Sequence, residues 1–585
     1  MRPRPRALAP LLLVVSACGD DTRASASDSA SVTLPATVSD PSTSTGAGSS
    51  GDTLTAGAPT TGGATGSATG SATGTTGPDV TTGEPGSTDA TSTGGVKPDA
   101  GASSTGDTTT GLVPSCTVVD DMDGTGACEM KAPADSFDPM VQWSFLGPDG
   151  LIESIVTPLV ANFTDDNGDG AIDLCDVPDV LVVAGTKGAS DTAPAFIFIL
   201  DGLTGAPHFK IATAVQYAGT PAIGDIDNDG FVEIVTTLPG GAAALVAFEH
   251  DGALKWQSAT PWVEAQSSAV ALADLDADGD VEIVAGTKIY DHNGVFLFGQ
   301  PGDRVYSAST AADLDGDGDL EIVYAHGAAH HDGKVLYNLP QIDAQGGLAF
   351  YPQVANLDDD DDPEVLVAAQ DALHVFEHTG VQKLQVSAPK PGSHGSGLPA
   401  TVHDFDGDGV SEFAASSGNA YTVYKRDGTI VWSANVIDAS GLAAGTAFDF
   451  LGDGVAEAMY ADEHTMFIFD GAGKPLLTTP RLSGTVTEYP TVADIDNDGS
   501  AEILVVSNTL LVGGNVDFTV QAVRDKEDRW IQARRIWNQH TYHVTNIRED
   551  GTIPQHEPKH WQLLNTFRTN AQIEGGAVCK PPIPL

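Results

Sequence analysis

Residues 225–233 read Asp-Ile-Asp-Asn-Asp-Gly-Phe-Val-Glu, and this short stretch decides how the chain folds. Its carboxylate side chains stand at positions one, three, five and nine, and Gly230 stands at position six. These four side chains and the carbonyl of position seven offer Ca²⁺ the hard oxygen ligands that it prefers. The glycine permits the sharp turn that brings position nine back to the ion. The nonapeptide therefore predicts a calcium-binding loop.

The same pattern returns along the chain at regular intervals. Five copies are intact, and they start at Asp225, Asp274, Asp313, Asp404 and Asp494. Three further copies deviate, with Asn167 at position three and Asp173 at nine after Asp165, Asp361 at six after Asn356, and Leu451 at three after Asp449. The first and last starts are 494 − 165 = 329 residues apart, so the mean spacing is 329/7 = 47 residues. Eight copies in register favour metal loops over solvated acidic turns without a metal.

The predicted calcium ligands are the side chains at positions one, three, five and nine, with about one ion per repeat. They are Asp165, Asn167, Asp169, Asp173, Asp225, Asp227, Asp229, Glu233, Asp274, Asp276, Asp278, Glu282, Asp313, Asp315, Asp317, Glu321, Asn356, Asp358, Asp360, Glu364, Asp404, Asp406, Asp408, Glu412, Asp449, Asp453, Glu457, Asp494, Asp496, Asp498 and Glu502. The eight nonapeptides hold 35 of the chain's 80 acidic residues, so they account for much of the net charge of −53. Without cations, carboxylates this close together repel one another strongly.

The sequence around each copy predicts four short strands. In the second repeat these are Thr220–Ile226, Val232–Leu238, Ala243–Glu249 and Ala253–Gln257. A turn signature such as Asp251-Gly252 separates the last two strands, and similar dipeptides follow most other copies. Four strands in about 45 residues are the content of one β-propeller blade. An EF-hand is excluded, because it has a helix on each side and Glu at position twelve, where the second repeat has Thr236.

Tryptophans mark the predicted fourth strands at Trp256, Trp432 and Trp530. Trp143 precedes the first nonapeptide and stands at the same phase. We expect its strand to complete the last blade and so to close the ring. The predicted fold class is therefore all-β, a calcium-binding propeller over residues 140–530, with eight blades preferred and seven as the alternative.

These motifs resemble those of the FG-GAP and VCBS repeat family, whose calcium loops lie in integrin α-like β-propellers. The resemblance covers about residues 140–530 and rests on the recurring Asp-x-Asp-x-Asp-Gly-x-x-Glu pattern. It implies that each calcium loop joins the first two strands of a blade. Integrin-like propellers usually have seven blades and fewer metal loops, whereas eight motifs favour eight blades, as in some calcium-bearing polysaccharide lyases. The resemblance is informative for fold and metal and says little about function.

The N-terminal residues predict export and lipid anchoring. Three arginines among the first six residues precede the apolar residues 7–15, as in a signal peptide over residues 1–17. Val15-Ser16-Ala17-Cys18 resembles the lipobox of bacterial lipoproteins, so Cys18 is the predicted lipidation site. Residues 18–112 are rich in Ser, Thr, Gly and Ala, lack aromatic residues and predict a disordered tether. The predicted location is a bacterial membrane, with the outer membrane or cell surface favoured.

Four cysteines follow Cys18, and they are Cys116, Cys128, Cys175 and Cys579. An even number in an exported chain predicts two disulfides. Among three connectivities we favour Cys116–Cys128, inside the lead-in segment 113–139, together with Cys175–Cys579. A zinc site is disfavoured, because the chain has no Cys-x-x-Cys pair.

The C-terminal tail, residues 531–585, differs in composition from the repeats. Residues 524–570 hold eight of the 27 Lys and Arg residues, with three Trp and four His. The candidate ligand-binding side chains are Arg534, Arg535, Trp537, His540 and His543. In this interpretation Trp stacks on sugar, and Arg or His meets carboxylates. In the alternative, which we favour, the tail packs on the propeller, Trp side chains fill gaps and Arg side chains pair with spare Asp.

The composition and the missing motifs narrow the function. The net charge of −53 disfavours nucleic acid and anionic lipid surfaces as partners. The chain has no G-x-S-x-G, H-E-x-x-H or G-x-x-x-x-G-K-[ST] motif, so no catalytic residue is predicted. The first hypothesis is a monomeric, lipid-anchored, non-enzymatic surface protein that binds carbohydrate or protein. The alternative is an extracellular polysaccharide lyase or related enzyme with an Arg/His/Trp site in the C-terminal region.

Overall fold

The computed structural model describes residues 130–240, 243–343, 351–369, 372–389, 399–574 and 577–578. All described residues belong to the unit formed by residues 108–585. The signal peptide, Cys18, the tether, Cys116, Cys128 and Cys579 lie outside the described residues, so what the sequence predicts for them stays a prediction. Within the described part, no helix combines the length and the hydropathy needed to cross a membrane.

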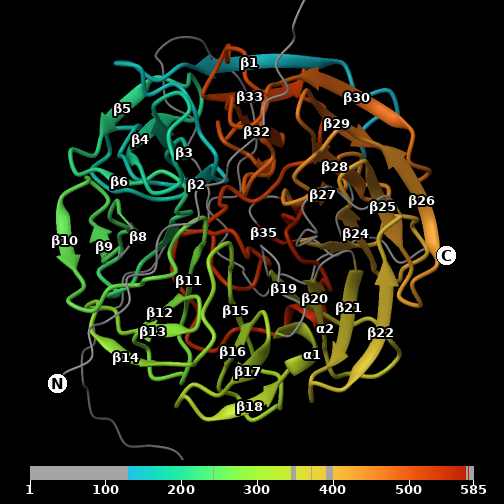
Figure 1. Ribbon diagram of the computed structural model, residues 1–585. Coiled ribbons are helices and arrows are strands. Elements are labelled where there is room, and N and C mark those ends of the chain that lie inside the picture. The colour runs from blue at the N-terminus through green and yellow to red at the C-terminus, as the bar shows by residue number, and fades with distance from the viewer. Residues whose placement is uncertain are drawn as a thin grey trace, which may run out of the picture. The chain divides into compact units, whose positions relative to one another are not determined.

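The described strands form eight antiparallel sheets that stand around a common centre as the blades of a propeller (Figure 1). Each blade has four strands from the centre outward, and blade one has a fifth, β6. This arrangement confirms the all-β fold and the choice of eight blades over seven.

In most blades the strands follow one another in chain order from the first, innermost strand to the fourth. Blade one consists of β2 (Leu159–Ala161), β3 (Asp179–Gly185), β4 (Pro194–Asp201) and β5 (Pro207–Lys210), with β6 (Val215–Gln216) paired to β4. Blades three and four consist of β11 (Val270–Ala273), β12 (Glu282–Ala285), β13 (Lys288–Tyr290), β14 (Phe296–Gly299), β15 (Thr310–Ala312), β16 (Glu321–Tyr324), β17 (Gly327–Ala329) and β18 (Val335–Asn338). Blades five and six consist of β19 (Pro352–Ala355), β20 (Glu364–Ala369), β21 (Ala372–Glu377), β22 (Gln382–Ser387), β23 (Thr401–His403), β24 (Glu412–Ser416), β25 (Ala420–Tyr424) and β26 (Ile430–Asn435). Blade seven consists of β27 (Thr446–Phe448), β28 (Glu457–Ala461), β29 (Thr465–Phe469) and β30 (Pro475–Pro480).

Two short helices and a small hairpin complete the described elements. They are α1 (Pro340–Asp343), α2 (His560–Leu563), β34 (Ile573–Glu574) and β35 (Ala577–Val578).

Blade two confirms the strand prediction closely. Its strands are β7 (Ala222–Gly224), β8 (Glu233–Thr237), β9 (Leu245–Phe248) and β10 (Leu254–Gln257), and each lies inside one of the predicted ranges. The three inner strands are wholly buried, whereas β10 is half-buried or exposed along its length. Inner strands are buried on both faces because neighbouring blades pack against them, so they read as continuous apolar runs.

Blade eight joins the two ends of the ring. Its strands are β31 (Thr491–Ala493), β32 (Glu502–Val506), β33 (Val520–Asp525) and, as the fourth, β1 (Pro139–Phe145). Trp143 lies opposite Ala522, as expected for a strand that completes the last blade. The prediction for Trp530 is wrong, because Trp530 follows β33 outside any strand. The fourth position of the blade is already filled by β1, so the chain leaves the sheet there, and the buried Trp530 indole donates to the Ser136 carbonyl at 2.6 Å.

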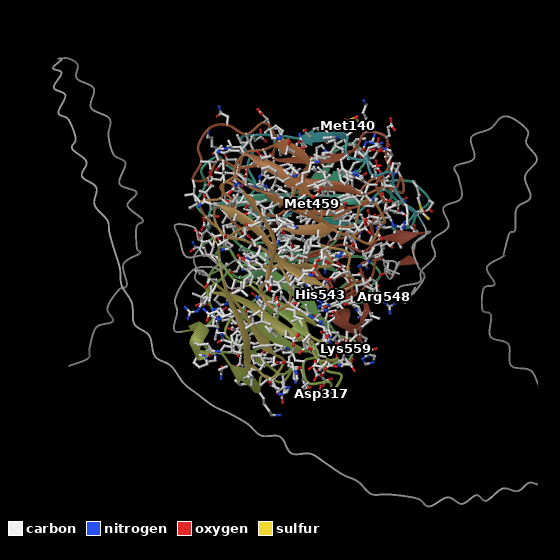
Figure 2. All side chains as sticks on the ribbon, turned by 90° about the vertical axis from the view of Figure 1, so that its right-hand side faces the viewer. Met140, Asp317, Met459, His543, Arg548 and Lys559 are labelled. Atoms are coloured by element: carbon white, nitrogen blue, oxygen red, sulfur yellow. The ribbon has the colours of Figure 1, made fainter. Side chains whose placement is uncertain are left out.

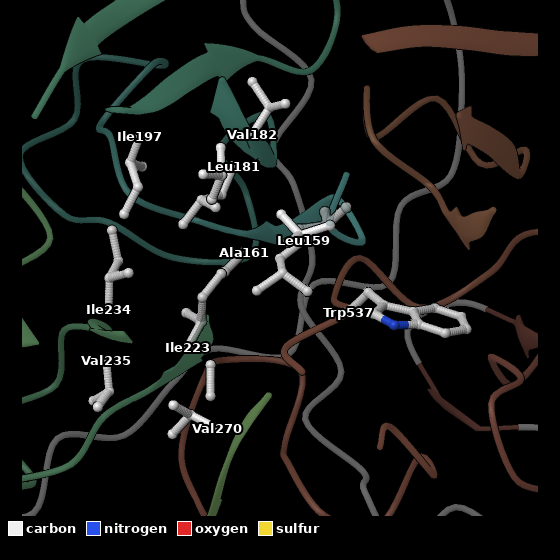
Figure 3. Close-up of a cluster of buried hydrophobic side chains, with 14 of the residues drawn as sticks. Leu159, Ala161, Leu181, Val182, Ile197, Ile223, Ile234, Val235, Val270 and Trp537 are labelled. Atoms are coloured by element: carbon white, nitrogen blue, oxygen red, sulfur yellow. The ribbon is translucent and has the colours of Figure 1, made fainter. Parts of the chain in front are cut away.

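The tail runs through the centre of the ring (Figure 1). Trp537 lies beside the apolar side chains of the innermost strands β2, β7 and β11 (Figure 3). The tail then meets the first strand of each blade, or the residue before it, in chain order. The contacts are Trp537 with Val160, Asn538 with Ile223, Gln539 with Leu272, Thr541 with Ser309, His560 with Val354, Phe567 with Val402, Arg568 with Thr446 and Asn570 with Val492. One peptide segment is thus hydrogen-bonded to all eight blades.

Candidate metal loops

The acidic nonapeptides join the first and second strands of their blades, as the resemblance implies. In blade two the loop lies between β7 and β8, and Asp225 and Glu233 are buried while Asp227 and Asp229 are exposed. Positions one and nine therefore anchor the loop, and positions three and five project from it.

Hydrogen bonds inside the loop explain why these residue types are needed. The Asp225 carboxylate accepts from the backbone N–H groups of Asp229 at 3.1 Å and Gly230 at 3.0 Å, and Asp229 accepts from Phe231 at 3.0 Å. Gly230 has a φ of 91°, a left-handed conformation that favours glycine. The loop starting at Asp274 repeats the bonds of its first carboxylate. The conformation of the loop therefore depends on the aspartates at positions one and five and on the glycine at position six.

Position nine ties the end of the loop to its start. One oxygen of Glu233 accepts from the backbone N–H of Ile226 at 2.9 Å. The same bond from the position-two N–H to the ninth carboxylate is made by Glu282, Glu321, Glu364, Glu412, Glu457 and Glu502. In these seven loops the second oxygen is left for another partner.

The carboxylates of a loop lie close enough to share one cation. Asp225, Asp227 and Asp229 each offer an oxygen within 4.8 Å of the others. Burial, reinforced by neighbouring carboxylates, raises the pKa of Glu282 to about 8 and that of Asp494 to about 7. A cation bound beside these carboxyls would favour their charged form and so offset the cost of their burial. The described loops therefore contain groups that could hold a metal ion.

Lysines already contact several of these loops, which the sequence reasoning missed. Lys255 Nζ, on the fourth strand of blade two, lies 2.7 Å from Asp227 Oδ2 and 3.0 Å from Glu233 Oε1. In blade five, Lys383 pairs in the same way with Asp358 and, at 2.8 Å, with Glu364. Both lysines stand three residues after the glycine of the blade's last turn, which is the signal that could have revealed them.

The carboxylates of the other loops contact different basic side chains, or none. In blade six, Lys425 Nζ lies 2.8 Å from Asp406, in blade four His330 lies 2.8 Å from Glu321, and in blade eight Arg524 lies 3.5 Å from Asp498. Within the described ranges, the four predicted ligands of the loop at Asp274 have no Lys, Arg or His at ion-pair distance. The only such pair of that loop joins His292 to Asp280, which stands at position seven. The predicted ligands of the loops in blades one and seven also lack such a pair among the described residues, but each of those loops has three ligand carboxylates where the loop of blade three has four.

The first carboxylate or amide of each variant loop, or a residue beside it, has contacts or burial of its own. In blade one, Asp176, outside the nonapeptide, accepts from the backbone N–H groups of Asp166, Asn167 and Asp173. In blade five, Asn356 uses its backbone N–H and carbonyl to bind Asn565 of the tail. In blade seven, Asp449 is buried and its pKa is raised to about 6, chiefly by burial.

The candidate ligand-binding side chains of the tail all lie inside the protein. Arg534, Arg535, Trp537, His540 and His543 are each at most 5% exposed. Arg534 donates to the carbonyls of Val544 at 2.7 Å and Ile547 at 2.6 Å, and Arg535 pairs with Glu549 at 2.7 Å. These side chains bind protein groups, and their role in ligand binding stays a prediction.

Cys175 lies just after the first loop, half-buried, and it is not a free thiol. Its predicted partner Cys579 lies outside the described residues. The proposed pairing of the two therefore stays a prediction.

Comparisons with known proteins agree with this geometry. Residues 225–285 match a family model described as an FG-GAP-like repeat. No curated protein matches the sequence. Among solved structures, the biofilm matrix protein Bap1 of V. cholerae aligns with a TM-score of 0.65 and 21% identity over 76% of this chain and 100% of that one. This likeness shows a shared fold.

Two rhamnogalacturonan lyases align less well. The exotype enzyme YesX has a TM-score of 0.48 and 17% identity over 78% of this chain and 83% of its own. The enzyme PL11 of Bacillus licheniformis has a TM-score of 0.47 and 17% identity over 77% of this chain and 83% of its own. We draw no conclusion about activity from either.

Proposed function

We propose that this protein is a non-enzymatic, calcium-binding propeller of the bacterial cell surface that binds carbohydrate or protein. The observation that supports this most is the set of carboxylate loops between the first and second strands, whose third and fifth positions are exposed in blades two, three and four. Calcium is the ion class that suits clustered carboxylates and carbonyls.

In this proposal calcium sets the geometry of the recognition loops. In blade two the ion would be held by Asp225, Asp227 and Asp229, whose oxygens already lie within 4.8 Å of one another. Bound there, calcium supplies positive charge and fixes the directions of the loop carbonyls.

Neighbouring loops are also joined directly, so that ordering one loop supports the next. The Asn228 side chain of blade two donates to the Gly279 carbonyl of blade three at 2.8 Å. The Leu320 N–H of blade four donates to the Leu275 carbonyl of blade three at 2.8 Å. Calcium bound in one blade would therefore restrain its neighbours as well.

A ring pair beside the loop of blade two favours a carbohydrate ligand. Phe231, at position seven, is 38% exposed and stacks on His250 of the next turn, with ring centroids 4.4 Å apart and planes inclined by 22°. An exposed aromatic face next to a cation site offers sugar both a stacking surface and a partner for its hydroxyls.

The proposed location is the outside of the cell, with lipid on Cys18 and residues 18–112 as the tether. The shared fold with a biofilm matrix protein supports a place outside the cell. We also propose that the protein acts as a monomer, and that it contacts the membrane only through the lipid.

A polysaccharide array that measures both retention and new chain ends tests this function. We expect retention without cleavage in Ca²⁺ and its loss in EDTA. Phe231→Ala should weaken retention, whereas Val410→Ala, at position seven of the loop in blade six and 36% exposed, serves as the matched control. Calcium-dependent cleavage would instead establish the lyase hypothesis.

A further inference from the structure

Three potential metal ligands that belong to none of the acidic loops meet in the tail. His543 Nε2 lies 2.8 Å from Glu557 Oε1, and His560, the first residue of α2, completes the group. The ligand atoms of the three residues all lie within 4.8 Å of one another. In the view of Figure 2, His543 and the neighbouring Lys559 lie in the lower half of the molecule. The chain thus brings two imidazoles and a carboxylate from residues 543–560 to one point.

The outer nitrogen of each imidazole is fixed by a backbone carbonyl. His543 Nδ1 lies 2.8 Å from the Thr541 carbonyl, and His560 Nε2 lies 2.8 Å from the Val354 carbonyl. A carbonyl only accepts hydrogen bonds, so each of these nitrogens carries the hydrogen. A neutral His560 ring therefore presents a lone pair at Nδ1, whereas His543 Nε2 is hydrogen-bonded to Glu557.

The Nδ1 nitrogen of His560 finds no hydrogen-bond partner among the described residues. His560 Nδ1 has no partner although the side chain is fully buried. Beside it, His543 Nε2 is hydrogen-bonded to Glu557 Oε1 at 2.8 Å, and a metal ion would take the place of the proton in that pair. Buried polar atoms are nearly always paired, so the unpartnered His560 nitrogen next to an imidazole and a carboxylate indicates a missing partner.

The surroundings hold the two imidazoles in place. Phe567 stacks on His543 with ring centroids 5.3 Å apart, and Trp561 packs edge-on against His560 at 5.1 Å. Burial, and secondarily the nearby His543, lowers the pKa of His560 well below its usual value. The Thr545 hydroxyl donates to Glu557 Oε1 at 2.8 Å and so orients the carboxylate. Imidazoles whose outer nitrogen is held by a backbone carbonyl are typical of metal ligands.

We propose that His543, Glu557 and His560 bind one transition-metal ion of the zinc class. Two imidazole nitrogens and one carboxylate are a common protein ligand set for Zn²⁺, whereas Ca²⁺ takes oxygen ligands. Because His560 is also bound to Val354 of blade five, the ion would fasten the tail to the ring. The inference is independent of the function proposed above.

Cobalt titration of the full chain tests the site. The protein is stripped with EDTA, dialysed, saturated with Ca²⁺ so that the acidic loops are filled, and titrated with Co²⁺. We expect one Co²⁺ per chain with the intense visible absorption of a four-coordinate ion, bleached when Zn²⁺ is added. No such absorption in the wild-type protein would overturn the proposal.

Two variants and a matched control assign the signal to these residues. His560→Gln and Glu557→Gln should each weaken Zn²⁺ binding by at least about tenfold, since even outer-sphere changes cost that much. His556→Gln, an exposed histidine in the same segment, should bind Zn²⁺ like the wild type. Thermal unfolding in Ca²⁺ alone verifies that each variant is folded, and Glu557→Gln alone suffices if His560→Gln does not fold. Unchanged Zn²⁺ affinity in folded Glu557→Gln would contradict the assignment.

Discussion

Trp537 in the tail and Val160 in the first strand of blade one are joined by two backbone hydrogen bonds, each 2.9 Å long. This is the pairing of an antiparallel sheet, made between the tail and the inner wall of the ring. The Trp537 side chain is fully buried. The tail therefore belongs to the core of the propeller.

Replacing Trp537 by Ala should destabilise the ring strongly. Removal of a fully buried Trp typically costs about 3–5 kcal/mol of unfolding free energy. Trp256→Ala, on the half-buried fourth strand of blade two, is the control and should cost about 1–2 kcal/mol. Denaturant unfolding of both variants measures the difference. Equal losses of unfolding free energy in the two variants would contradict the conclusion that the tail belongs to the core.

Chelation should lower the melting temperature of the wild-type protein by many degrees, because calcium bound only to the folded state stabilises it by mass action. Asp276→Asn, at position three of the uncompensated loop in blade three, should remove one calcium equivalent in elemental analysis. Asp280→Asn, which changes an exposed carboxylate of the same loop outside the predicted ligand set, should leave the equivalents unchanged. An unchanged melting temperature in EDTA would contradict the calcium assignment.

Lys255 and calcium compete for the same carboxylates in blade two, since Lys255 Nζ contacts both Asp227 and Glu233. Lys255→Met should therefore lower the melting temperature in EDTA and enlarge its rise when Ca²⁺ is added. Lys334→Met is the control, because Lys334 is exposed and pairs only with Asp332 among the described residues. A calcium response equal to that of the wild type would show that the lysine and the ion do not compete.

The calcium-free protein should lose stability as the pH rises from about 4.5 to about 8. The pKa of Glu282 is raised from 4.5 to about 8, chiefly by burial, so the folded state binds more protons than the unfolded state in this window. Stability then falls with rising pH, and it falls no further once Glu282 is ionised in both states. Melting temperatures in EDTA at pH 5 and pH 8 test this. Calcium should reduce the difference, and a melting temperature in EDTA that rises with pH would refute the prediction.

Replacing Cys18 by Ser should move the protein from the membrane to the soluble fraction. Acyl chains on that cysteine are the proposed anchor, and stable anchoring requires more than one lipid chain. Cell fractionation followed by immunoblotting measures the shift, with Cys175→Ser as a control that keeps the anchor. Membrane association of the Cys18→Ser variant would rule out this anchor.

The sequence correctly predicted those features of the fold that depend on local patterns of residues. The eight copies of the nonapeptide indicated the number of blades. The flanking apolar runs indicated the strands of blade two. Trp143 predicted the closing strand because its phase matches that of Trp256 and Trp432. Each of these signals lies within one repeat, where the hydrophobic period reports directly on burial.

The missed features depend on contacts between residues far apart in the chain. Trp530 has the right residue type, but β1 already occupies the position predicted for it. Lys255 reaches the acidic loop of its blade only once the four strands have paired. The meeting of His543 with His560 follows from the path of the tail, which no short motif encodes.

The route of the tail also bears on how the molecule is made. A nascent chain that stops before residue 531 already contains all eight blades, but it lacks the segment that is hydrogen-bonded to each of them. Prematurely terminated products would leave the innermost strands accessible to water and to proteases. The ring thus reaches its mature form only after residues 537–570 have been translated.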